Sequence, residues 1–208
     1  MDVRRLAPGL WRWTARHPEA AGWPQDAADG LPWPDLVGCV YYEASDAVCL
    51  IDPLLPGGEE DEFLAHLDRD VERLELPVVI LLTAEWHRRS SDVLAQRYGA
   101  TITIGESLPA GIEAHSIEGA DEVQLAYFIR PHRALVVAEV FGVDSSGTLG
   151  VYPSPGLIDR AALDKSLQSL LELQVERLLV SHGEPVLEDG RAAMELALRQ
   201  SLPAQPED

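Results

Sequence analysis

The sequence of 208 residues has few cysteines and no long apolar run. Its cysteines are Cys39 and Cys49, both in apolar, strand-like segments, and a disulfide between them would require an oxidising compartment. The first residues lack the continuous apolar core of a signal peptide, and no segment is long enough to cross a bilayer as a helix. We therefore expect a soluble, cytoplasmic protein with reduced thiols.

Basic residues are also scarce. Lys and Arg total 16 against 35 for Asp and Glu, which gives a formal charge of −19. A surface of this sign repels phosphate backbones and anionic lipid, so we expect neither nucleic acid nor membrane partners. The simplest interpretation of the acidity is solubility, and a small molecule is the ligand class that it leaves open. The sequence sets no oligomeric state.

Two common catalytic motifs are missing. There is no GxSxG nucleophile elbow, and the scattered glycines do not have the spacing of a phosphate-binding loop. A serine hydrolase of that type and a nucleotide-binding loop are therefore not predicted. The length and the 46% hydrophobic content predict one domain over residues 1–208.

The hydrophobic pattern predicts alternating groups of strands and helices. Residues 39–43 and 47–51 read as a hairpin, residues 77–83 and 100–105 as buried strands, and residues 122–141 as two strands around a turn at Arg130–Arg133. Helical patterns cover residues 57–76, 91–99, 188–201 and 159–174, the last with Asp159 as N-cap. Residues 142–156 read as irregular. This order favours an α+β fold, a four-layer αββα sandwich.

Residues 16–38 have neither a helical nor a strand period, and they contain four prolines. A loop of this length in a compact domain is usually disordered or functional. Trp23 and Trp33 are too apolar to favour full exposure, so we expect the loop to fold back over the protein. Such rings are more often part of the core, but both are also candidates for an aromatic-lined ligand pocket. His17, in the same loop, can also reach such a site.

Several sequence segments resemble those of the metallo-β-lactamase fold superfamily, in particular of its glyoxalase II-like members. These are "LAPGLWRW", "VCLIDP", "VVILLT", "RALVVAEVF" and "LLVSHGEPVLEDG", which follow in the family's order. The resemblance implies the αββα fold. It also implies that Asp52 orients the metal-site loop, that His182 is a metal ligand, and that the chemistry is hydrolysis of an ester, thioester or amide.

The metal signature itself is degenerate. The family reads THxHxDH after the "LLT" strand, whereas Thr83 is followed here by "AEWHRR". Aligned without a gap, every ligand position of that motif is replaced, and a shift by one residue recovers only His87. Glu139 matches the bridging aspartate, and Ala120 matches a later ligand histidine. The resemblance therefore predicts no dinuclear centre.

Two hypotheses follow from this pattern. In the first, the metal centre is lost and the chain is a non-catalytic or small-molecule-binding module. Its former cleft is then lined by Asp52, Glu85, His87, Arg88, Arg89, Glu139 and His182. In the second, His87, Glu139 and His182 hold one zinc or iron ion, as a two-histidine, one-carboxylate set can. Arg88 and Arg89 oppose a dication, so we favour the first hypothesis and expect no cofactor.

Each of these residues also has a structural explanation. His87 would satisfy free amides at the start of the helix near Ser90. Glu139 stands on an apolar strand and cannot be buried alone, so we expect Arg88 or Arg89 to pair with it where the metal would lie. His182 would then be held by Glu139 or Asp52.

Overall fold

The structure is a computed structural model that describes residues 2–20, 35–120, 122–144, 146–152 and 159–201. Its strands are β1 Asp2–Ala7, β2 Leu10–Arg16, β3 Leu36–Glu43, β4 Val48–Ile51, β5 Val78–Leu81, β6 Thr101–Thr103, β7 Ile112–Ile117, β8 Gln124–Ile129, β9 Ala134–Val137, β10 Phe141–Val143, β11 Leu149–Val151 and β12 Arg177–Leu179. Its α-helices are α1 Glu60–Leu74, α2 Ser91–Tyr98, α3 Arg160–Leu170 and α4 Gly190–Ser201. Short 3-10 turns η2 Glu85–Arg88 and η3 Arg130–His132 complete the described elements.

The first sheet has the order β1-β2-β3-β4-β5-β6. Its first four strands are antiparallel neighbours. Strands β5 and β6 are added in parallel, because α1 connects β4 to β5 and α2 connects β5 to β6. The predicted hairpin is confirmed, with Glu43 opposite Val48 across the turn. The second sheet has the order β12-β9-β8-β7, and its predicted turn after β8 is confirmed as η3. The prediction of irregular chain over residues 142–156 was wrong in part, since β10 and β11 pair there.

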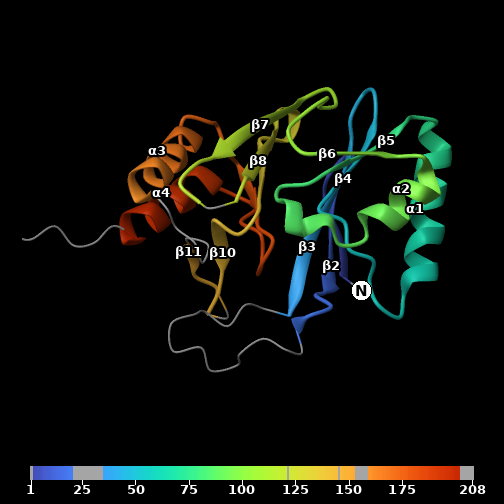
Figure 1. Cartoon of the computed structure of the whole chain (residues 1–208), viewed down its shortest axis with the longest axis horizontal. Coiled ribbons are helices and arrows are strands. Elements are labelled where there is room, and N and C mark those ends of the chain that lie inside the picture. The colour runs from blue at the N-terminus through green and yellow to red at the C-terminus, as the bar shows by residue number, and fades with distance from the viewer. Residues whose placement is uncertain (1, 21–34, 121, 145, 153–158, 202–208) are drawn as a thin grey trace, which may run out of the picture.

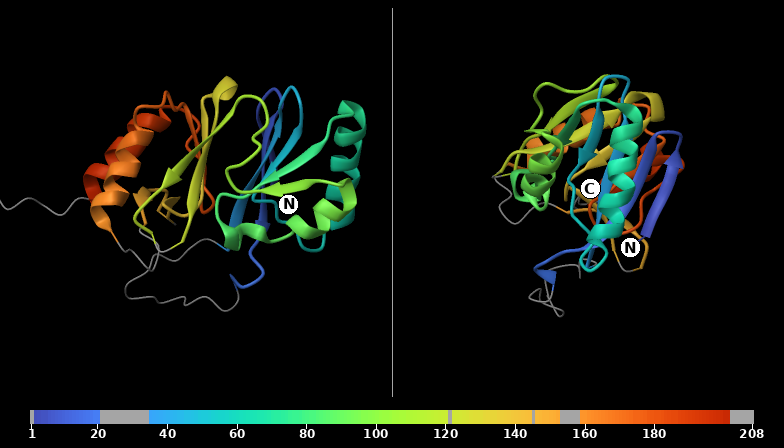
Figure 2. Two further views of the ribbon diagram at one scale, coloured as in Figure 1. Left: turned by 45° about the horizontal axis from the view of Figure 1, so that its top comes forward. Right: turned by 90° about the vertical axis from the view of Figure 1, so that its right-hand side faces the viewer.

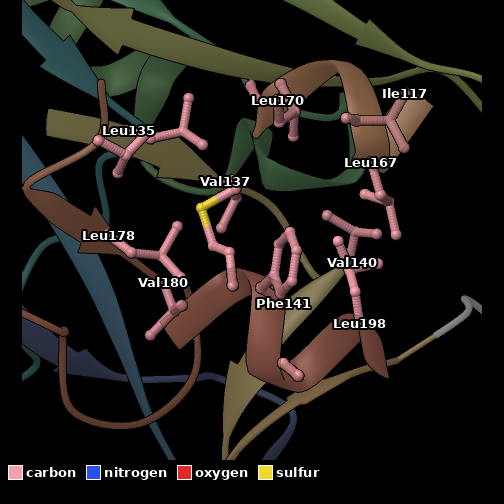
Figure 3. Close-up of a cluster of buried hydrophobic side chains, with 14 of the residues drawn as sticks. Ile117, Leu135, Val137, Val140, Phe141, Leu167, Leu170, Leu178, Val180 and Leu198 are labelled. Carbon is pink, nitrogen blue, oxygen red and sulfur yellow. The ribbon is translucent and has the colours of Figure 1, made fainter. Parts of the chain in front are cut away.

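The elements form four layers (Figure 1). Helices α1 and α2 cover the outer face of the first sheet, and α3 and α4 cover the outer face of the second; the left view of Figure 2 shows the same separation. Three apolar clusters fill the spaces between layers. Figure 3 shows the one under α3 and α4, where Phe141, Leu167 and Leu198 point toward one another. The predicted αββα sandwich is confirmed.

Cys39 and Cys49 are buried, free thiols that lie on opposite faces of the first sheet. Cys39 belongs to the cluster under α1, and Cys49 belongs to the cluster between the two sheets. Burial raises the pKa of Cys39 to about 11 and that of Cys49 to about 12, so neither is a reactive thiolate near neutral pH. Among the described residues, no helix has the length and apolar character needed to span a bilayer.

The sequence places the start of α3 correctly, at Asp159. Its Oδ1 accepts a hydrogen bond of 3.0 Å from the amide of Ala162, which satisfies one of the free donors of the first turn. Replacing Asp159 with Ala is expected to lower the free energy of unfolding by about 1 kcal/mol. Urea denaturation measures this, and Asp159→Ser, which keeps a capping oxygen, is expected to retain most of the stability.

Candidate functional site

The site lies where strands of both sheets end. Strands β4 and β5 are parallel, so Asp52 and Thr83, which follow them, meet at one edge of the first sheet. Turn η2 then carries His87. In the second sheet β9 and β12 are also parallel, and Glu139 and His182 follow their ends. The topology therefore brings residues that are far apart in the sequence to one place.

Asp52 is the buried anchor of the site. Its carboxylate accepts hydrogen bonds from the amide of Thr83 at 2.8 Å and from the Thr83 hydroxyl at 2.5 Å. Its Oδ2 lies 3.0 Å from Nδ1 of His87. Burial alone would raise the pKa of Asp52, but the charge and hydrogen bond of His87 outweigh it and lower the pKa. Asp52 therefore stays ionised, and its hydrogen bonds to Thr83 hold the start of the loop after β5.

His87 lies between two carboxylates and is only 1% exposed. Nδ1 faces Asp52, and Nε2 lies 3.6 Å from Oε1 of Glu139. Burial by itself would lower the pKa of His87, but the charge and hydrogen bond of Asp52, together with Glu139, raise it. The two carboxylates therefore favour the protonated form of the imidazole that lies between them.

Glu139 joins His87 to His182. Its Oε1 lies 3.7 Å from Nε2 of His182, and its side chain is 24% exposed, so the cluster opens to solvent here. Burial would raise the pKa of Glu139, yet both histidines lower it to well below its usual range. We call Asp52, His87, Glu139 and His182 the carboxylate–histidine chain.

The two arginines of the loop do not pair with Glu139, so that prediction was wrong. Arg88 makes a two-pronged contact with Asp92 on the exposed surface of α2. Arg89 turns inward with a φ of 39° and donates to the carbonyl of Asp52 at 3.3 Å and to the Ser181 hydroxyl at 3.2 Å. A non-glycine residue at positive φ has a strained backbone. At Arg89 this conformation directs the side chain toward the backbone at Asp52, next to the carboxylate–histidine chain.

The prediction that His87 caps the next helix was also wrong, because both of its nitrogens face carboxylates. Ser90 stands at the start of α2 without a side-chain capping bond, and its hydroxyl instead accepts from the amide of Leu55. Glu85 is exposed and lines a surface hollow of about 620 Å³ with Trp86, outside the carboxylate–histidine chain.

Three residues complete the surroundings. Thr83 and Ser181 were not predicted, although each adjoins a motif residue, because a hydroxyl carries no signal of its own in the sequence. His17 lies near enough to Arg89 to feel its charge: burial lowers the pKa of His17 and the charge of Arg89 lowers it further, while Glu19 opposes both. Trp23 and Trp33 fall outside the described residues, so the predicted ligand pocket around them stays a prediction.

The residues present do not fit the metal centre of the resembled family. The chain places Ala84, Trp86, Arg88 and Arg89 at the positions of its histidine and aspartate ligands. His87, Glu139 and His182 do meet, but within the described ranges no group of three or more His, Cys, Asp and Glu is arranged so that it could hold a metal ion. The guanidinium of Arg89 beside them further opposes a dication.

The structure is similar to solved metallo-β-lactamase-fold proteins. An archaeal metallo-β-lactamase superfamily protein from Sulfolobus tokodaii aligns with a TM-score of 0.64 and 16% identity, over 96% of this chain and 88% of that one. The metallo-β-lactamase FIM-1 from Pseudomonas aeruginosa, in its mono-zinc form, gives 0.62 and 11%, over 96% and 95%. A metallo-β-lactamase from Erythrobacter litoralis gives 0.61 and 16%, over 95% and 90%. No family model matches the sequence, and no curated protein matches it significantly. The chain therefore has the metallo-β-lactamase fold.

Proposed function

We propose that this chain is a metal-independent, small-molecule-binding protein on the metallo-β-lactamase fold. The observation that carries the proposal is the carboxylate–histidine chain, in which the imidazole of His87 lies 3.0 Å from Asp52 and 3.6 Å from Glu139. When protonated, His87 does there what a cation would do, because its charge compensates the buried Asp52 and the partly buried Glu139. A fold does not carry its chemistry when the site differs, so hydrolysis does not follow from the fold.

A second candidate is a hydrolase of an ester, thioester or amide with one zinc or iron ion at His87, Glu139 and His182. One observation favours it. Among the described residues Nε2 of His87 has no hydrogen-bond partner within normal distance, while Nδ1 is held by Asp52. Metal-binding histidines are commonly oriented by a carboxylate in this way. The two proposals differ in whether Nε2 of His87 carries a proton or binds a metal ion.

Metal content separates the two candidates. Elemental analysis of untagged protein purified without chelators is expected to find well below one equivalent of zinc or iron. Added zinc is expected to leave the melting temperature unchanged, because a ligand that binds only the folded state would raise it.

Glu139→Gln is the matched variant, since it keeps the shape and removes the charge. Metal near one equivalent that disappears in Glu139→Gln would overturn the metal-independent proposal and establish the mononuclear site. A metal content that is equally low in both proteins supports the metal-independent proposal. A panel of esters and thioesters is then expected to be hydrolysed at the background rate.

A further inference from the structure

A second hollow lies on the outer side of the first sheet, away from the carboxylate–histidine chain. It has a volume of about 420 Å³ and lies between α1 and strands β1, β2 and β3. Its principal lining side chains are Trp11, Trp13, Tyr41, Phe63, His66 and Asp70. The volume falls in the range of small-molecule pockets, about 300 to 1,000 Å³, and such pockets are mostly apolar with few polar groups.

The local structure builds this aromatic surface in a simple way. Trp11 and Trp13 are two residues apart on β2, so they share one face of the sheet, and Tyr41 lies directly opposite Trp11 on β3. On α1, Phe63 and Asp70 are seven residues apart and share the helix face toward the sheet. Figure 2 (right) shows the strands β1 and β2, in blue, to one side of α1.

The walls of this pocket are fixed before any ligand arrives. The indole Nε1 of Trp13 donates a 2.9 Å hydrogen bond to the carbonyl of Leu54. The rings of Trp13 and Phe63 lie with centroids 5.1 Å apart, tilted by 41°. Both side chains are buried. A rigid aromatic wall binds a flat ring at a low cost in side-chain entropy.

The carboxylate at the rim is already paired. Arg73 donates to Asp70 at 3.1 Å and to Glu43 at 2.6 Å. Nη2 of Arg69 lies 2.6 Å from Nδ1 of His66, and because a guanidinium only donates, Nδ1 accepts and the proton of neutral His66 is on Nε2. The guanidinium of Arg5 lies over the ring of Trp11, 5.7 Å from its centroid. An ionic ligand would lose hydration against the apolar walls of the pocket.

We propose that this pocket, which we call the Trp11–Trp13 pocket, binds a small, uncharged, planar aromatic molecule. The aromatic walls contact both faces or edges of the ring, and the Nε2–H of His66 and the carboxylate of Asp70 offer one donor and one acceptor at the rim. This inference goes beyond the proposed function, because the Trp11–Trp13 pocket shares no lining residue with the carboxylate–histidine chain. It does not depend on the metal content of the other cluster, so each can fail alone.

Indole and indole-3-acetate form a matched pair of probes, since they share a ring and differ in charge. Saturation-transfer NMR and calorimetry on the full chain are expected to show saturable binding of indole and at least about tenfold weaker binding of indole-3-acetate. Val3, at the mouth of the pocket, is 46% exposed, and Val3→Trp is expected to fill the opening and weaken indole binding by about tenfold or more.

Val93→Trp is the control, because Val93 is 58% exposed on α2 and does not line the pocket. It is expected to leave indole binding unchanged. Absence of indole binding, equal binding of both probes, or equal loss in both variants would overturn the proposal. A concentration-dependent dimer in sedimentation that Val3→Trp dissociates would also overturn it, because the surface would then belong to a second copy of the chain.

Discussion

Replacing Asp52 with Ala is expected to lower the free energy of unfolding by about 3–5 kcal/mol. The Asp52 carboxylate accepts from the amide and hydroxyl of Thr83 and faces the imidazolium of His87, all without contact with water. Its removal leaves a buried positive charge and two buried donors unpaired, and breaking one side of a buried pair has this large effect. Equilibrium urea unfolding near neutral pH measures it.

Asp52→Asn and Asp92→Ala are the controls for that measurement. Asp52→Asn keeps an acceptor for Thr83 but removes the charge that faces His87, so a smaller loss than in Asp52→Ala is expected. In the described part of the chain Asp92 pairs with exposed Arg88, and its loss is expected to change stability little. Equal stability of Asp52→Ala and Asp92→Ala would show that the anchoring role assigned to Asp52 is wrong.

The fold was predictable because its signals are local and repeat along the chain. The hairpin of β3 and β4, the strand β5 with its apolar run, and the cap at Asp159 each follow from neighbouring residues. The paired strands β10 and β11 were missed, since each has three residues and a loop rich in Gly, Ser and Thr separates them. Short pairs of this kind depend on tertiary packing more than on sequence pattern.

The members of the site were predictable only in part. The structure brings together Asp52, His87, Glu139 and His182, as the sequence analysis proposed, whereas Glu85 lines a separate hollow and Arg88 pairs with Asp92. The predicted pairing of Glu139 with an arginine was wrong, because sequence proximity to the loop does not distinguish the two arginines from His87. Asp92 follows Arg88 by four residues, a spacing that favours an ion pair on the surface of a helix. The inward turn of Arg89 depends on an unusual backbone angle that the sequence does not signal.

Stability is expected to fall as the pH rises from about neutral into the alkaline range, because His87 loses its proton. The pKa of His87 is raised above its ordinary 6.5, so folding is linked to protonation. The stabilisation is complete below 6.5, where the unfolded chain also binds the proton, and it disappears as the pH passes through the higher folded pKa. The pKa of Glu139 is lowered from 4.5, so its contribution is present above that pH and is lost on acidification.

His87→Gln isolates this linkage. Near pH 5.5 the variant is expected to lose about 3–5 kcal/mol relative to the parent, because the buried Asp52 and the partly buried Glu139 lose their cation. The difference is expected to shrink at alkaline pH, where the parent has lost the same proton. His132→Gln is the matched control, since burial lowers the pKa of His132 and the pH dependence of its effect has the opposite sign. A His87→Gln penalty that stays constant across pH would mean that His87 is neutral in the folded protein, which removes the internal cation on which the metal-independent proposal depends.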